Sequence, residues 1–415
     1  MKVLVLSTVF PNPAQPLHGL FVFERARHMP AHAEVVVVAP VSWMLRLRQR
    51  VPHREVHGNL TVVHPTYFYV PGIMKALDGL CLFLSTLWTV RMLRREFAFD
   101  LIDSHFSFPE GFAAVMLGRW FGCPVTITLR GTIGHLSAQR LRRLAISWAL
   151  RNATRLIAVG HPLKDSAVSL GADPSRVDVI PNGVDTRRFA PIDRADARAA
   201  LGLPAEGRLI VSAGHLSPRK GFDRVLRVLP DLLADMPDLS FAIVGGAGVE
   251  RDNVAALERL VRESSLEPHV IFTGAQPPER VALWMNAADV FVLASDNEGC
   301  PNVVWEALAC GRAVVASKVG ETDRMVPSWA GVLFDDAHDL PALRESLRRA
   351  LQTDWDRTAI REHAAAHTWP RVAERVFAQW RRACEARDVD GAAPRAAAAD
   401  RISAAPVSRI GVKAK

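Results

Sequence analysis

The stretch EGCPNVVWEALACG, residues 298–311, carries two acids, Glu298 and Glu306, around the start of a short apolar segment. Pro301 suits a first helical turn and Gly311 suits the residue that ends a helix. The free N–H groups at such a helix start attract phosphate through hydrogen bonds and the helix dipole. A carboxylate on this helix needs a partner, and sugar or ribose hydroxyls are suitable donors. A capping or ion-pair role for either acid is the alternative.

Cations precede this segment in the loop SAGHLSPRKGFD, residues 212–223, which follows an apolar run and contains His215, Arg219 and Lys220. Cations at the end of a strand suit a phosphorylated ligand. A solvated basic turn is the alternative. The small residues of VGGAGVE, 244–250, also fit a turn near phosphate. They lack the spacing of the dinucleotide fingerprint, and an ordinary turn explains them equally.

The elements that must position these loops are short apolar runs that alternate with helix-length amphipathic stretches. Runs that are apolar on both faces indicate parallel sheets covered by helices on both sides. We predict two such series and therefore two doubly wound α/β domains, joined near residues 185–207. The strands are expected at 2–8, 34–40, 99–104, 124–129, 155–160 and 177–182, and then at 208–214, 239–246, 269–274, 289–295 and 313–317.

Length and composition agree with this organisation. The chain has 415 residues, 49% hydrophobic and 23% charged, which is typical of a globular protein of two domains. Its formal net charge of +8 fits nucleic acid, anionic membrane or phosphorylated ligands, and charge alone does not choose among them. Five scattered cysteines indicate reduced thiols in a cytoplasmic protein rather than disulfides or a zinc site.

Three segments bear on location and on the chain ends. MKVLVLSTVFPNP, residues 1–13, is better interpreted as a first strand than as a signal peptide. The apolar segment 79–90 is too short to cross a membrane, so no transmembrane segment is expected. Residues 370–386 predict a packed amphipathic helix, and residues 388–415 predict a disordered tail.

Together, the motifs resemble the retaining glycosyltransferases of family 4, which have the two-domain GT-B fold. The match spans roughly residues 1–385. It rests on two acids separated by seven residues and on IPNGVDTRRF (180–189), which resembles the interdomain signature of that family. It also rests on the stretches DVFVLASDNEG (289–299), ALACG (307–311), RKG (219–221), SKVGE (317–321) and FPNPAQPLHGLFVFERARHM (10–29). The last stretch is similar to members that build cell-surface polysaccharides, such as teichuronic acid enzymes.

The resemblance implies a role for each matching residue. Glu306 would bind the nucleotide ribose, and Glu298 would bind hydroxyls of the transferred sugar. Lys220, helped by Arg219, would neutralise the leaving diphosphate. Gly19 would let the N-terminal loop approach the donor closely. The amides at the helix start would bind sugar and phosphate, and the residues concerned are Gly299, Cys300, Pro301, Asn302 and Val303.

The chain departs from the family pattern at two positions. His215 stands where many members place Arg, and Arg130 stands where many place a His near the transferred sugar. Arg130 could instead contact a charged sugar or a phosphorylated acceptor. His105, in DSHFSFPEG, also follows a strand, and either a place facing the cleft or a structural role fits it.

By this resemblance we expect a GT-B enzyme with two Rossmann-like domains facing a central cleft. Residues 1–185 would bind the acceptor, residues 186–368 the nucleotide sugar, and the helix 369–387 would pack back towards the N-terminal domain. The enzyme would be a retaining hexosyltransferase that moves a sugar from a UDP- or GDP-sugar to a glycan or lipid-linked acceptor in surface polysaccharide synthesis. A nucleotide-sugar epimerase or phosphorylase of the same fold is an alternative, and so is a non-catalytic, membrane-associated assembly protein.

Cofactors and partners follow from the same expectation. No carboxylate cluster has the spacing of metal ligands, so we expect neither a metal nor another cofactor. No nucleic acid partner is expected. The basic stretches 42–50 and 135–155 interleave Arg with large apolar residues. They predict salt-sensitive, peripheral contact with the anionic inner face of the cytoplasmic membrane, although a solvated basic helix also fits 135–155.

Overall fold

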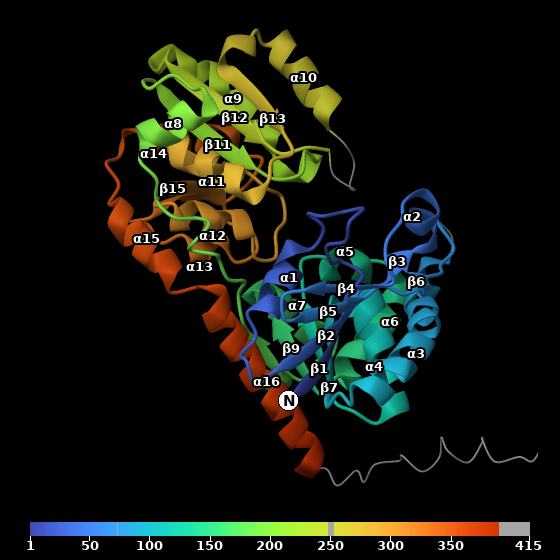
Figure 1. Cartoon of the computed structure of the whole chain (residues 1–415). Coiled ribbons are helices and arrows are strands. Elements are labelled where there is room, and N and C mark those ends of the chain that lie inside the picture. Colours follow the sequence, from blue (N-terminus) through green and yellow to red (C-terminus); the bar gives the residue numbers. More distant parts are fainter. Residues whose placement is uncertain (73, 248–252, 390–415) are drawn as a thin grey trace, which may run out of the picture.

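The computed structural model describes residues 1–72, 74–247 and 253–389 (Figure 1). Strands up to residue 179 form one sheet with a small two-stranded ribbon, and strands from residue 208 onward form a second sheet. The chain therefore folds into two α/β domains, an N-terminal one and a C-terminal one.

The N-terminal sheet has eight strands in the order β10-β9-β8-β7-β1-β2-β5-β4, and all neighbours are parallel except β4 with β5. β3 and β6 pair separately as a short parallel ribbon. The strands are β1 Lys2–Leu6, β2 Glu34–Val38, β3 Val41–Ser42, β4 Arg54–His57, β5 Leu60–Val63, β6 Thr66–Tyr67, β7 Leu101–His105, β8 Val125–Leu129, β9 Arg155–Ala158 and β10 Val177–Val179.

Helices cover both faces of this sheet because its strands are apolar on both sides. Helices α3, α4 and α6 cover one face, whereas α1 and the C-terminal helix α16 cover the other. The helices of this domain are α1 Leu20–Arg27, α2 Trp43–Arg48, α3 Asp78–Glu96, α4 Phe112–Phe121, α5 Ile133–Ser137, α6 Arg140–Asn152 and α7 His161–Ser169.

The C-terminal sheet has six parallel strands in the order β13-β12-β11-β14-β15-β16, the order of a dinucleotide-binding fold. Its strands are β11 Arg208–Ala213, β12 Leu239–Val244, β13 Val270–Gly274, β14 Val290–Leu293, β15 Ala313–Ser317 and β16 Gly331–Phe334. The remaining helices are α8 Arg194–Leu201, α9 Phe222–Asp235, α10 Val254–Glu263, α11 Pro278–Ala287, α12 Asn302–Ala309, α13 Thr322–Met325, α14 Leu340–Gln352, α15 Arg357–Ala365 and α16 Trp369–Val389.

All eleven predicted strands are present, and most end a residue or two earlier than predicted. The sequence missed β3 and β6, which are two residues each, and the hairpin β4–β5. β4 lies at the sheet edge with three of its four residues exposed, so it lacks the apolar pattern that identified the others. β16 was missed because it is only four residues long and starts at a glycine.

Helix α16 leaves the C-terminal domain and packs along the N-terminal one (Figure 1). Its predicted stripe is present, with Val372, Val376 and Trp380 buried against β-strand and α1 side chains and Phe377 partly buried beside them. The helix continues to Val389, and the rest of the predicted tail lies outside the described residues.

Helix α3 is longer than the apolar segment that marked it. Within the described residues, Lys75–Glu96 is one helical segment that is long and apolar enough, by length and composition, to cross a membrane. The sequence estimate counted only the uncharged residues 79–90 and was too short. However, Leu82, Phe83 and Val90 of α3 belong to the N-terminal core, and a spanning position would pull them out of it.

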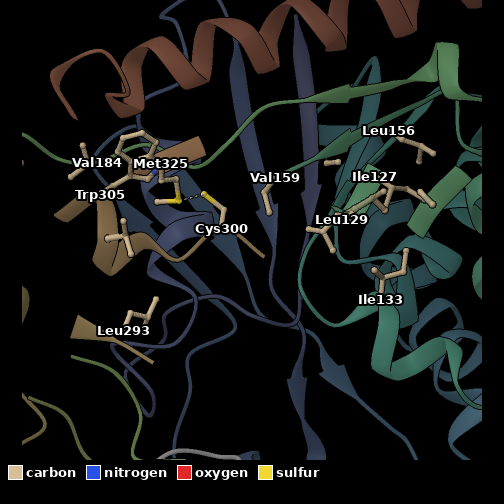
Figure 2. Packing of buried hydrophobic residues seen from close by; sticks show 14 of the residues in the cluster. Ile127, Leu129, Ile133, Leu156, Val159, Val184, Leu293, Cys300, Trp305 and Met325 are labelled. Carbon is tan, nitrogen blue, oxygen red and sulfur yellow. Dashed lines mark hydrogen bonds between the residues drawn. The ribbon is translucent and has the colours of Figure 1, made fainter. Parts of the chain in front are cut away.

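The two domains share a hydrophobic junction. Ile127 and Leu129 of the N-terminal sheet belong to the same buried cluster as Trp305 and Cys300 at α12 (Figure 2). The Cys300 sulfur lies 4.0 Å from the Met325 sulfur. The start of α12 is therefore fixed by packing from both domains.

Candidate functional site

The loops at the carboxyl ends of the two sheets meet, which is where ligands of such sheets bind. A Cβ on Gly131, after β8, would lie 3.2 Å from the backbone nitrogen of Gly299, after β14. Nearby, Glu321 accepts hydrogen bonds from the His161 backbone at 2.7 Å and bonds the His161 ring at 2.8 Å. Glycines at this contact let the two backbones approach directly.

Two of the predicted residues contact each other on the C-terminal side. Lys220 Nζ donates to Glu298 Oε1 at 2.6 Å, and Arg219 lies 3.3 Å from the same oxygen. Both Lys220 and Glu298 are largely buried. Burial opposes the charged form of Glu298, but the two cations outweigh it, and the pKa of its carboxyl falls below the usual value. The ion pair holds the two side chains together in one place.

The backbone of this cluster depends on Gly221, which follows Lys220 with a φ of 70°. A Cβ there would lie 2.0 Å from the carbonyl oxygen of Ala294. Only glycine tolerates this approach, which presses the Lys220 loop onto the loop of Glu298. The contact continues through Asp296, whose N–H donates to the Arg219 carbonyl at 2.9 Å.

Helix α12 begins at Asn302, and its preceding residue, Pro301, supplies no side-chain cap. In the described part of the chain, no hydrogen bond uses the backbone N–H of Asn302 or Val303. Pro301 itself has no N–H to offer, so within the predicted set it shapes the loop. A helix start with open N–H groups suits an anionic ligand.

Glu306 lies one turn further along α12, half-buried. Its carboxylate has no hydrogen-bonded partner among the residues described. Burial raises the pKa of Glu306 to about 7, Glu24 adds to this effect, and Arg188 opposes it. An acid in this position lacks the donors that a carboxylate needs, as expected of a group that meets a ligand's hydroxyls.

The sequence did not predict the ion-pair network beside Glu306. Arg188, in the linker between the domains, pairs with Glu24 of α1 at 3.4 Å and with Glu279 of α11 at 3.0 Å. Arg27 of α1 pairs with Asp185 of the linker at 3.2 Å. These pairs connect helix α1 of the N-terminal domain, the linker and helix α11 of the C-terminal domain. The stretch IPNGVDTRRF was identified as the interdomain signature, but nothing in it showed which groups Arg188 meets.

On the N-terminal side, His105 and Arg130 lie in one buried cluster. The His105 ring lies between two guanidinium groups, with Nε2 2.5 Å from Arg25 and Nδ1 3.1 Å from Arg130. Arg25 also pairs with Asp103 at 2.5 Å. Burial and the neighbouring Arg25 hold the pKa of His105 well below its ordinary value. Both ring nitrogens are occupied by protein groups, which favours the structural role of His105.

Arg130 connects the two sides. Its guanidinium donates to Asn182 Oδ1 at 3.0 Å and stacks over the ring of Phe21 at 4.2 Å. Asn182, in the linker, in turn donates to Asn302 at the start of α12 at 2.7 Å. The chain Arg130–Asn182–Asn302 thus ties the N-terminal cluster to the donor-side helix. Sequence reasoning missed Asn182, although it lies in the stretch that marked the interdomain segment.

The N-terminal loop approaches the C-terminal domain. Gly19 has a φ of 74°, and a Cβ there would lie 2.3 Å from the Val9 carbonyl oxygen, so the loop requires glycine. Burial lowers the pKa of the preceding His18, and the nearby His215 of the opposite domain lowers it further. His18 was not predicted. His215 is exposed.

Two further features are the second predicted loop and a pocket in the N-terminal domain. Gly245, in the second predicted loop, lies against the Gly214 carbonyl, where a Cβ would come within 1.8 Å, and residues 248–250 of that loop lie outside the described residues. A largely apolar pocket of about 300 Å³ lies in the N-terminal domain between the loop after β1, α1 and β4, and it includes Phe10, Phe23 and His57.

Comparison with solved structures identifies the structural class of this fold. A sucrose-phosphate synthase from Thermosynechococcus elongatus superposes with a TM-score of 0.77 at 22% identity, over 93% of this chain and 100% of that one. Anabaena HepE in complex with UDP superposes with a TM-score of 0.71 at 19% identity, over 92% and 99%. The architecture is therefore GT-B, as predicted.

The sequence comparisons identify the family. Residues 19–188 match the family model described as Glycosyltransferase Family 4, and residues 193–367 match Glycosyl transferases group 1. A D-inositol 3-phosphate glycosyltransferase from Nocardioides is 30% identical over 80% of this chain and 78% of its own. TuaC, a putative teichuronic acid biosynthesis glycosyltransferase from Bacillus subtilis, is 29% identical over 77% and 82%. The chain belongs to the family 4 glycosyltransferases.

Proposed function

We propose that this glycosyltransferase moves a hexose from a nucleoside-diphosphate sugar to its acceptor with retention of the anomeric configuration. The observation that carries this is the arrangement at α12. An ion pair of Lys220 and Glu298 lies beside open helix N–H groups. One turn further on lies Glu306, whose carboxylate has no hydrogen-bonded partner among the described residues. HepE has been solved with UDP and with UDP-glucose, which supports a nucleotide-sugar donor. We propose that this donor is a UDP- or GDP-sugar.

In this proposal the C-terminal cluster binds the donor. Glu306 accepts hydrogen bonds from the ribose hydroxyls, and the open N–H groups of α12 bind the diphosphate. The diphosphate also attracts Lys220, which leaves Glu298 free to accept from hydroxyls of the sugar. Lys220 and Arg219 supply positive charge close to the departing phosphate, on which negative charge builds. They do so without a metal ion.

The transfer step breaks the bond between the anomeric carbon and the diphosphate oxygen. The acceptor hydroxyl oxygen bonds to the same face of the sugar, and its proton goes to the leaving phosphate oxygen. A nucleoside diphosphate leaves without protonation by a carboxylic acid, so Glu298 and Glu306 do not act as the acid and nucleophile of a glycosidase. Rate enhancement comes from positioning and electrostatic stabilisation.

The acceptor is proposed to be a glycan or lipid-linked molecule of surface polysaccharide synthesis, bound on the N-terminal side. The name of TuaC includes teichuronic acid biosynthesis, which supports a surface polymer. The enzyme would act in the cytoplasm at the inner face of the cytoplasmic membrane, in peripheral contact with anionic lipid. The exposed Arg residues at 48, 50, 140 and 143 supply the charge for that contact.

A donor screen tests the proposal. Purified protein is incubated with UDP- and GDP-hexoses, and release of nucleoside diphosphate is measured with and without acceptor extracts. We expect slow hydrolysis of one donor, faster release with acceptor, and an α-linked product from an α-linked donor in the NMR spectrum. A product of inverted configuration would refute the retaining mechanism. An isomerised nucleotide sugar without acceptor would show an epimerase instead.

A further inference from the structure

Helix α3 exposes a second apolar face that the domain core does not use. Its inner residues, such as Leu82 and Val90, are buried, whereas Leu84 is 60% exposed and Trp88 is 69% exposed. At 100° per residue, the outward residues fall within about a third of the helix circumference. That outward stripe consists of Leu80, Leu84, Trp88 and Met92, and it is preceded by exposed Leu77 in the turn just before α3.

Neighbouring elements extend this stripe into a surface. The segment before α3 contacts α6, whose Leu141 and Leu144 are also exposed. Trp120, at the end of α4, lies against Phe83 of α3 at 6.4 Å between ring centroids and is 61% exposed. We call the outward residues of α3 together with Leu141, Leu144 and Trp120 the outer apolar surface. It lies on the side of the N-terminal domain away from α16 (Figure 1).

Exposed positive charge borders the outer apolar surface. Arg91 and Arg95 continue the outward stripe of α3, and Arg140 and Arg143 alternate with the leucines of α6. The nearby acids are paired within the protein. Asp78 lies 3.6 Å from Lys75, and Glu96 lies 3.2 Å from Arg54. The surface therefore combines large apolar side chains with cations that have no acidic partner among the residues that the structure describes.

We propose that the outer apolar surface docks this enzyme on an anionic lipid bilayer, with α3 lying in the plane of the membrane. This inference rests on the membrane location in the proposed function and names the element that carries it. Trp88 and the leucines enter the interface, and the arginines bind lipid headgroups. The inner face of α3 stays in the domain core, so the helix lies on the bilayer and does not cross it.

The charge pattern selects lipid over a second copy of the chain. Pairing two copies through this surface would bring the same arginines together, and like charges facing each other are unfavourable. An anionic leaflet instead attracts them and neutralises their charge. The stripe is also apolar from Leu77 to Met92, about four helical turns, which is longer than scattered surface leucines would give.

Flotation of purified full-length protein with vesicles tests the proposal. The vesicles contain either phosphatidylglycerol with phosphatidylcholine or phosphatidylcholine alone. The test variant is Leu84→Glu combined with Trp88→Glu. The matched control is Trp329→Glu, which changes a 48% exposed tryptophan in the C-terminal domain. We expect wild type and control to float with anionic vesicles, and the test variant to bind about tenfold more weakly or not at all.

Two further readouts keep the result interpretable. Arg91→Gln with Arg95→Gln should weaken binding at low salt and make it less sensitive to salt, because these residues supply part of the charge. Hydrolysis of the donor in solution should be unchanged in all of these variants, since none of the residues lies in the donor cluster. If the wild-type protein hydrolysed no donor, that result would refute the proposed function and would leave the docking proposal standing.

Three outcomes would overturn the docking proposal. The first is equal flotation of wild type and the α3 double variant. The second is absence of wild-type binding to anionic vesicles at low salt. The third is a wild-type dimer in light scattering that becomes a monomer in the double variant, which would assign the surface to a second copy of the chain.

Discussion

The two polar clusters at the meeting edges of the sheets are built in opposite ways. On the N-terminal side, Asp103, Arg25, His105 and Arg130 are buried and bonded to one another. On the C-terminal side, Glu306 has no hydrogen-bonded partner within the described chain, and open N–H groups begin α12. The first cluster is complete without a ligand, whereas the second needs one.

From this difference we infer distinct roles for the two clusters, a structural role on the N-terminal side and donor binding on the C-terminal side. A satisfied buried network rigidifies the residues around it. The N-terminal cluster does this for α12 through Asn182, which bonds both Arg130 and Asn302. The donor cluster has groups that gain their partners only on binding. Variants on the N-terminal side should therefore change stability most, and variants on the C-terminal side should change donor binding and turnover.

The largest effect is expected for Lys220→Ala. Its charge acts most strongly as negative charge builds on the departing diphosphate, so turnover should fall by about 100-fold or more. The Michaelis constant for the donor should rise much less. Steady-state kinetics checks this, with Lys318→Ala as control because Lys318 forms an exposed pair with Asp335. Equal loss in both variants would contradict a specific role for Lys220.

Arg130→His tests the closed cluster. It removes hydrogen bonds to His105 and Asn182, so the free energy of unfolding should fall by about 1.5–3 kcal/mol. The kinetic constants should change only a few-fold. Denaturant unfolding and kinetics on one preparation measure both effects. A large loss of activity with unchanged stability would instead place Arg130 in contact with a charged sugar or acceptor.

Glu306→Gln removes the charge but keeps the shape of the side chain. The ribose then loses a charge-assisted hydrogen bond, and donor affinity should fall about tenfold. Because the pKa of Glu306 is about 7, wild-type affinity should also increase as the pH rises from 6 to 8. The variant should lack this dependence. Identical pH profiles for the two proteins would show that Glu306 is not the titrating group.

The smallest effects concern stability. Here Glu306→Gln and Glu298→Gln should change the melting temperature in opposite directions. The pKa of Glu306 is raised in the fold, so its contribution is present below the unfolded value of 4.5 and is lost as the pH rises through about 7. The pKa of Glu298 is lowered, so its contribution is present above 4.5 and is lost as the pH falls through its folded value. At pH 8, Glu306→Gln should raise the melting temperature and Glu298→Gln should lower it.

Thermal melts between pH 4 and pH 8 check this pair of variants. The difference between Glu306→Gln and wild type should shrink towards pH 4, where the wild-type Glu306 carboxyl is neutral. The difference for Glu298→Gln should persist over this range, because the pKa of Glu298 is lowered in the fold. A lower melting temperature for Glu306→Gln at pH 8 would mean that the carboxylate already has a stabilising partner.

The sequence predicted the sheets well because parallel strands buried on both faces are continuous apolar runs. It also placed Lys220, Glu298 and Glu306 in one family pattern, since these residues occur in short motifs of fixed spacing. It could not predict the bonds of Arg130, because His105, Asn182 and Asn302 are far apart in the chain and meet only through the fold. The outer stripe of α3 was missed for a similar reason. Its apolar residues are continuous in sequence, and only packing separates the buried face from the exposed one.

Calorimetric titration of UDP and GDP in the presence of EDTA tests the central claim most directly, which is that the C-terminal cluster binds the donor without a metal ion. At pH 8 we predict that one nucleotide binds wild type in EDTA and binds Glu306→Gln about tenfold more weakly. Absence of binding in EDTA, restored by added magnesium, would contradict a metal-free donor site. Equal nucleotide affinity for wild type and Glu306→Gln would contradict the proposed hydrogen bonds between Glu306 and the ribose.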